Sequence, residues 1–201
     1  MLDAYIDRSN DHKKVNILKN KIIRIIQDHM GIPEFDEFEA CYNRKAALYY
    51  PAIIACRQTE QSIQFYKKHF NRNGIYMALC NHSGNAIVLG EYPIAKKAIK
   101  ECISMINSSD GWYYPSQYKV ENNKILLIFL TEERSACGDR DKILVAAQKA
   151  ASRFSKIIGH QYDEVSHVVL FNYIGLSMLC QTNTWESDLL NTNRLLPNLD
   201  E

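Results

Sequence analysis

The apolar residues of this chain come in short runs, and this limits how the chain can bury them. The two longest unbroken runs span residues 75–80 and 125–130, and each contains six residues. A helix needs about 20 consecutive apolar residues to cross a membrane, so neither run can do so. Short apolar runs bounded by turn-forming residues are typical of buried β-strands. We therefore expect a protein without a membrane segment that builds part of its core from strands.

Neighbouring apolar segments, separated by turn-forming residues, predict three β-hairpins. In the first of them the stretch between the strands, residues 81–85, reads Asn-His-Ser-Gly-Asn. The predicted strands span residues 75–80 and 86–89, 118–120 and 124–130, and 165–174 and 176–180, with a further short strand at 52–56. Strands joined by tight turns pair antiparallel, so we expect a mixed sheet that is largely antiparallel.

Between these segments, apolar residues recur at three- and four-residue steps and predict amphipathic helices. The predicted helices span residues 11–30, 33–49, 59–73, 93–107 and 139–158. Asp139 is the predicted N-cap of the last helix, whose inner face is rich in alanine and can lie close against a sheet. These elements predict a single α+β domain over residues 1–181, with two N-terminal helices and interleaved later ones, and a polar C-terminal arm over 182–201.

The charges of the chain are nearly balanced. The 24 Lys and Arg residues face 23 Asp and Glu residues, so the protein as a whole does not strongly attract nucleic acid or an anionic membrane. The first predicted helix places Lys13, Lys14, Lys21 and Arg24 on one side, where they could contact phosphates. Pairing with the acidic start of the second helix, or plain solvation, explains this face more simply. We therefore expect neither nucleic acid nor a membrane as a partner, and the oligomeric state stays open.

The cysteines and the absence of known motifs limit the kinds of reaction and cofactor that we expect for this chain. Six cysteines lie mostly in apolar segments and form no CxxC pair, which indicates reduced thiols and a cytoplasmic protein. The first residues carry no apolar signal-peptide core. The chain has no Walker loop, GxGxxG, HExxH or GxSxG motif. We expect no cofactor and no metal site.

Two predicted loops carry the leading functional hypothesis. Trp112, Tyr113 and Tyr114 are consecutive aromatic residues, which can anchor a ligand or, alternatively, close one end of the core. His82 lies in the predicted hairpin loop 81–85, beside Cys80, but two ligands are too few for a metal. The hypothesis is a binding domain that recognises a small molecule or a protein partner through residues 112–114 and 81–85.

The alternative hypothesis is a cysteine-dependent hydrolase or acyltransferase. The segments Ser-His-Val-Val-Leu, which contains His167, and Asn-Thr-Trp, which begins at Asn183, resemble the histidine strand and the asparagine-tryptophan segment of papain-like thiol hydrolases. The resemblance covers about 20 residues, and it implies that Asn183 orients the imidazole of His167, which activates a cysteine. Cys41 fits the cysteine-first order of that family. Cys137 precedes the predicted N-terminus of a helix, which favours a thiolate. Both remain candidates for the nucleophile.

Overall fold

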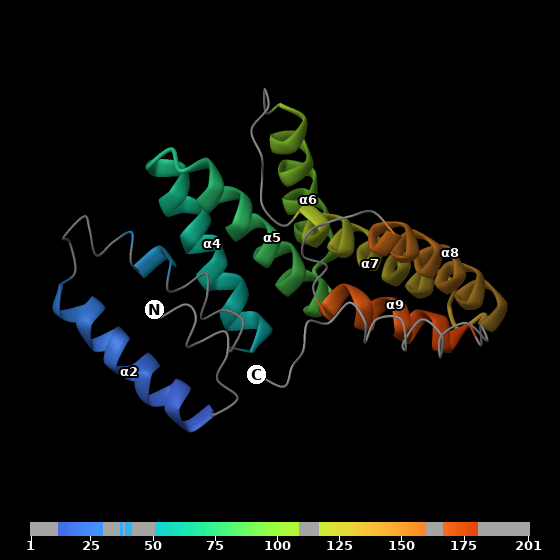
Figure 1. The fold of residues 1–201 in the computed structure, drawn as a ribbon, viewed down its shortest axis with the longest axis horizontal. Helices are drawn as coiled ribbons and strands as arrows, with labels where there is room; N and C mark the ends of the chain where they lie inside the picture. Colours follow the sequence, from blue (N-terminus) through green and yellow to red (C-terminus); the bar gives the residue numbers. More distant parts are fainter. Residues whose placement is uncertain are drawn as a thin grey trace. The chain divides into compact units, whose positions relative to one another are not determined.

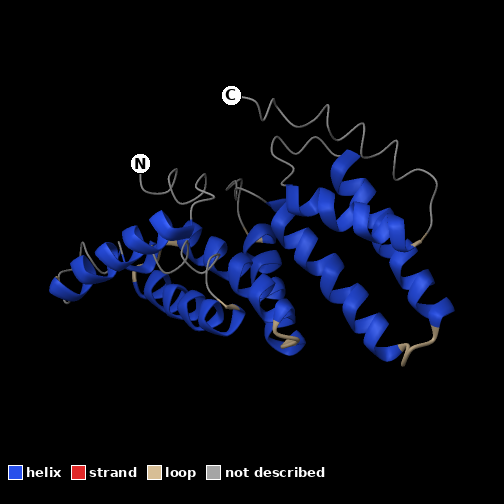
Figure 2. Cartoon of the chain, turned by 90° about the horizontal axis from the view of Figure 1, so that it is seen from below, coloured by secondary structure: helices blue, strands red, loops and turns tan. Residues whose placement is uncertain are grey.

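The described part of the chain consists of helices and the short turns between them (Figure 1). The computed structural model describes residues 12–29, 37, 39–41, 51–108, 117–159 and 167–180. The helices are α2 (His12–Asp28), α4 (Ala52–Lys68), α5 (Arg72–Val88), α6 (Tyr92–Asn107), α7 (Gln117–Ser135), α8 (Arg140–Gly159) and α9 (His167–Leu179). Figure 2 shows helices and turns in these ranges and no β-strand. The predicted α+β fold with a largely antiparallel sheet is therefore wrong.

The chain divides into two compact units, Met1–Asn85 and Ala86–Glu201. The first contains α2, α4 and most of α5, and the second contains α6 to α9. Two compact units can belong to one domain if they unfold together, so the single domain over residues 1–181 stays a prediction. The arm over 182–201 lies outside the described residues. Among the described helices, none is both long enough and apolar enough to cross a membrane.

The predicted first hairpin is the single helix α5. Its buried residues Tyr76, Leu79, Ser83 and Ala86 recur at three- and four-residue steps, which is the period of a helix rather than of a strand. The polar stretch 81–85 is the middle of this helix. Packing overrides the low helix propensity of its residues. The buried Ser83 hydroxyl is satisfied there, because it donates a hydrogen bond of 2.8 Å to the Cys80 carbonyl.

The predicted second hairpin is also one helix, α7, because this helix buries two opposite faces. Tyr118 and Ile125 are buried on one face, while Val120 and Leu127 are buried about 180° away around the axis. A segment that is apolar on both sides shows the uniform pattern of a central strand. The short predicted strand 52–56 is wrong too, because these residues form the start of helix α4.

The asparagines that suggested a turn in α7 are buried polar contacts. Asn122 Oδ1 accepts a hydrogen bond of 2.8 Å from Asn172 Nδ2 on α9, and Asn122 Nδ2 donates one of 3.0 Å to Asn123 Oδ1. Asn172 lies in the third predicted hairpin, which is the helix α9. The buried residues Val169, Leu176 and Ser177 of α9 have helical spacing. The last pair of predicted strands is therefore wrong as well.

The core of the second unit forms on the alanine-rich face of α8. The predicted cap of α8 is confirmed, since Asp139 Oδ1 accepts a hydrogen bond of 3.3 Å from the backbone N–H of Lys142. Ala147 and Phe154 have no exposed surface, and Ala150 is 3% exposed. The predicted inner face is therefore buried, but against helices instead of a sheet. Its partners are residues of α7 and α9: Tyr118, Ile125, Phe129, Val169 and Leu176.

Helices α4, α5 and α6 begin 20 residues apart and are joined by three-residue linkers. Phe70 in the first linker has φ of 54°, and Gly90 in the second has φ of 75°. Both linkers form the Schellman motif, in which a residue with positive φ ends the helix. The hydrogen bonds are Phe70 N to Lys67 O (3.3 Å) and Asn71 N to Tyr66 O (3.0 Å), and Gly90 N to Ile87 O (3.0 Å) and Glu91 N to Ala86 O (2.9 Å).

The two linkers give a matched pair of predictions. Phe70 adopts a left-handed conformation that favours glycine, and its side chain is 89% exposed, so it contributes little burial. We expect Phe70→Gly to raise the free energy of unfolding by about 1 kcal/mol. Gly90→Ala should lower it by a similar amount, about 1 kcal/mol. Urea unfolding measures both, and a destabilised Phe70→Gly variant would show that Phe70 makes a contact that outweighs its strain.

Two other glycines lie inside helices and should respond in opposite ways to alanine. A Cβ at Gly74 in α5 would overlap the ring of Tyr66, which is 4% exposed and cannot move away easily. A Cβ at Gly175 in α9 would meet no atom within 4 Å. We expect Gly74→Ala to destabilise the protein by about 1–3 kcal/mol through overpacking. Gly175→Ala should stabilise it by about 1 kcal/mol through helix propensity, and thermal unfolding distinguishes the two signs.

Candidate functional site

His82 lies in the interface between α4 and α5 rather than in a loop. Its Nδ1 is 3.0 Å from the hydroxyl oxygen of Thr59, which also lies 2.9 Å from the Ala55 carbonyl oxygen and 3.0 Å from that of Cys56. The predicted hairpin loop 81–85 is therefore wrong, because these residues are helical, and their predicted role in ligand binding stays a prediction. Burial lowers the pKa of His82, against the opposing effects of the Glu60 carboxylate and a hydrogen bond with the Cys56 backbone.

The contact between Thr59 and His82 has the length of a nucleophile–base pair, but it is structural. Thr59 has no exposed surface, so its hydroxyl cannot meet a substrate. The nearby Ser62 is equally buried, and its hydroxyl lies 3.0 Å from the Ala40 carbonyl oxygen and 2.9 Å from that of Gln58. These hydroxyls satisfy backbone carbonyls and join α4 to its neighbours.

The residues of the thiol-hydrolase hypothesis lie on helices and turns. Cys41 is half-buried in the helical segment 39–41. Cys137 is exposed in the turn between α7 and α8, with φ of 51° and its Sγ 3.9 Å from the Arg134 carbonyl oxygen. His167 begins helix α9, so the strand context that carried the resemblance to papain-like hydrolases is wrong. The His167 side chain and Asn183 lie outside the described residues, and a contact between thiol and imidazole stays a prediction.

The aromatic residues Trp112, Tyr113 and Tyr114 lie between α6 and α7, outside the described residues. Their predicted role as a binding loop therefore stays a prediction. The structure adds a different candidate site, which sequence patterns did not suggest.

Two hollows lie along the seam between the antiparallel helices α7 and α8. Their volumes are about 440 and 460 Å³, and both are open to solvent. The first is lined by Glu121, Lys124, Ile125, Ile128, Arg153, Lys156 and Ile157. The second is lined by Thr131, Glu132, Ser135, Ala136, Asp141, Lys142, Val145, Ala146 and Lys149. On each helix these residues recur at three- and four-residue steps, so the hollows follow one face, which we call the α7–α8 groove.

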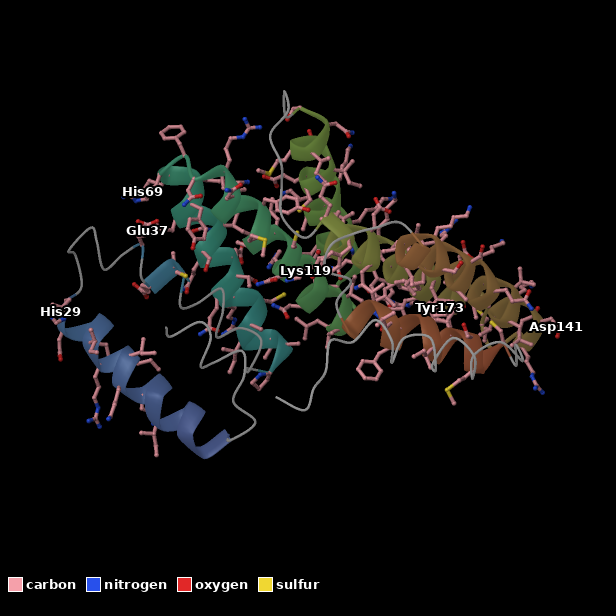
Figure 3. All side chains as sticks on the ribbon, in the orientation of Figure 1. His29, Glu37, His69, Lys119, Asp141 and Tyr173 are labelled. Carbon is pink, nitrogen blue, oxygen red and sulfur yellow. The ribbon has the colours of Figure 1, made fainter. Side chains whose placement is uncertain are left out.

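The α7–α8 groove has an apolar floor and charged walls. Ile125 and Ile157 are buried at the floor, and Ile128 is half-buried. The floor continues into the second hollow as Val145, which is 48% exposed, and the buried Ala146. Asp141 marks the end of the groove at the turn that joins α7 to α8 (Figure 3).

Charge is unequal along the α7–α8 groove. The first hollow has three cationic side chains and one carboxylate, whereas the second has two of each. Glu121 lies 3.3 Å from Lys124, and Asp139 lies 3.0 Å from Lys142. Hydrogen bonds from the side chain and backbone of Lys142 lower the pKa of Asp139, which keeps this pair charged. Across the described residues, Lys149 and Arg153 take part in no ion pair.

The signal for this groove is only half visible in the sequence. Lys149, Arg153 and Lys156 fall on one side of a helix that the sequence predicts correctly. The opposite wall is the helix α7, for which the sequence predicts a β-hairpin. A groove between two helices cannot be inferred when one of them is predicted to be strands.

The described ranges hold no group of three or more His, Cys, Asp or Glu residues that could bind a metal ion. No protein-family model, curated protein or solved structure matches this chain.

The buried imidazole predicts a pH dependence of stability. Burial lowers the pKa of His82 in the folded state below its ordinary value of 6.5, so the unfolded chain binds a proton first as the pH falls. The contribution of His82 is constant well above about pH 7.5 and is lost as the pH falls through about 6.5 towards the folded-state pKa. Urea unfolding at several pH values should show this loss.

His82→Gln should flatten the pH dependence, whereas the same change at the exposed His69 should leave it intact. An equal slope in wild type and His82→Gln would show that His82 does not carry it.

Proposed function

We propose that this chain is a binding domain that holds a segment of a partner protein in the α7–α8 groove. The observation that carries the proposal is an open groove with an apolar floor between half-buried charged side chains of α7 and exposed charged side chains of α8. Apolar contact area provides affinity, and a charged rim selects the partner. The proposal keeps the binding role expected from the sequence and moves the surface from the predicted loop 81–85 to α7 and α8.

The shape of the groove favours a polypeptide over a small molecule. Sites for small molecules usually bury about 70–90% of the ligand surface. The two hollows instead are open and follow each other along the seam. The lining residues of α7 run from Glu121 to Ser135, which at about 1.5 Å per residue is roughly 21 Å. An amphipathic helix of about four turns has this length and presents an apolar stripe to such a groove.

The helices on either side of the groove share one core. Phe129 of α7 and Phe154 of α8 belong to the same buried cluster, together with residues of α9. Because this cluster fixes both walls, the groove exists before a partner binds. A preformed groove avoids the entropic cost of ordering the site on binding.

A selection experiment tests the proposal without a known partner. Peptides of about 18 residues, roughly five helical turns, are displayed as a random library and enriched on the wild-type protein. Ile128→Gln removes an apolar side chain from the floor of the groove. We expect enriched peptides to lose at least about tenfold in affinity for this variant, because burial of an isoleucine side chain contributes about 1.5–3 kcal/mol.

Ile94→Gln is the matched control. Ile94 lies on α6, is 44% exposed and is not among the residues that line the groove. Urea unfolding verifies that both variants are folded. The proposal is contradicted if no peptide is enriched, or if Ile94→Gln and Ile128→Gln affect binding equally.

A further inference from the structure

The charges of the α7–α8 groove indicate which kind of segment fits it. We propose that the partner segment is an amphipathic helix with a row of carboxylates along one edge, and that these carboxylates lie against Lys149, Arg153 and Lys156 of α8. This inference rests on the proposed function, because it names the chemistry of the partner for the same groove.

The three cations form a regular ladder. Lys149, Arg153 and Lys156 are separated by four and three residues, so they follow one face of α8, and all three are exposed. From the first to the last the ladder spans about 10.5 Å along the helix axis. Glutamates at positions i, i+4 and i+7 of a second helix have the same spacing. Two helices side by side can therefore pair all three charges at once.

Charge also sets where the acidic end of the partner lies. In the first hollow Arg153, Lys156 and Lys124 outnumber the single carboxylate of Glu121. In the second hollow Glu132 and Asp141 balance the two lysines. A segment with its carboxylates towards one end places two of them against Arg153 and Lys156 in the first hollow and one against Lys149 in the second. The rest of the segment carries no net charge and lies along the second hollow. Such complementarity adds specificity and raises the rate of association.

The same groove is poorly suited to nucleic acid. A phosphate backbone is charged along its whole length, and its affinity depends on the number of phosphates that cations neutralise. Glu121, Glu132 and Asp141 would repel it at both ends of the groove. The isoleucines of the floor can pack against leucine or phenylalanine side chains of a peptide. A phosphate backbone has no such apolar side chains. The mixture of apolar floor and alternating charge favours a peptide.

Fluorescence polarisation with three labelled peptides of about 18 residues tests the inference. The first carries a leucine stripe and glutamates at i, i+4 and i+7 near one end. The second is a composition-matched isomer whose glutamates do not share an edge. The third has lysines in place of the glutamates of the first. We expect the first peptide to bind most tightly and to weaken as salt is added, because exposed charges are screened.

Charge reversal identifies the residues that pair with the peptide. The double variant Arg153→Glu and Lys156→Glu should weaken binding of the glutamate peptide by at least about tenfold and should strengthen binding of the lysine peptide. The matched control is Lys96→Glu and Lys100→Glu on α6, which changes the net charge equally at exposed lysines outside the groove. The control should leave the order of the three peptides unchanged.

The outcomes separate the inference from the proposed function. If the lysine peptide or the isomer binds wild type as tightly as the glutamate peptide, and Ile128→Gln abolishes that binding, the groove binds protein but the charge ladder does not select it. If Ile128→Gln affects none of the peptides, both proposals are wrong. If an oligouridine of about 20 nucleotides displaces the glutamate peptide and depends on Arg153 and Lys156, the ligand is a nucleic acid and the inference is overturned.

Discussion

Close packing against the alanine-rich face of α8 is the contact on which the second unit depends. Ala147 and Phe154 have no exposed surface, and they belong to one buried cluster with residues of α7 and α9. Alanines let neighbouring helices approach closely, and the large ring of Phe154 fills the space that they leave. The outer face of α8 is therefore held in a fixed orientation. The α7–α8 groove and its row of cations exist only because this inner face is so well buried.

The sequence predicts some helices and misassigns others for a physical reason. The helices α2, α6 and α8 have one apolar face, so their period is visible and their positions are confirmed. In α7 two opposite faces are buried, and in α5 the polar stretch 81–85 is held by tertiary contacts such as Thr59 with His82. Local sequence does not distinguish a helix buried on two sides from a central strand. None of the predicted strands that lie wholly in the described residues is a strand in the structure.

The candidate site can be predicted from the sequence only in part, for the same reason. The cations of α8 lie on a correctly predicted helix, whereas the groove also requires the position of α7 in space. His82 was recognised as a notable residue but assigned to the wrong environment, because asparagine, serine and glycine around it are typical of turns. In the structure, His82 lies in a helix and contacts the buried hydroxyl of Thr59. Chemistry that depends on contacts between distant residues, such as Asn122 with Asn172, is not readable from local patterns.

The hydrogen bond between Asn122 and Asn172 has a consequence for the uniqueness of the fold. Apolar side chains alone allow one helix to slide along another by a turn with little loss of contact. The hydrogen bond of 2.8 Å from Asn172 Nδ2 to Asn122 Oδ1 opposes this, because a slide would break it and leave the oxygen of the buried Asn122 without this donor. Replacing the pair with leucines could increase the hydrophobic contribution and yet leave α9 with several alternative positions. The hydrogen bond between Asn122 and Asn172 therefore favours one alignment of α9 against α7.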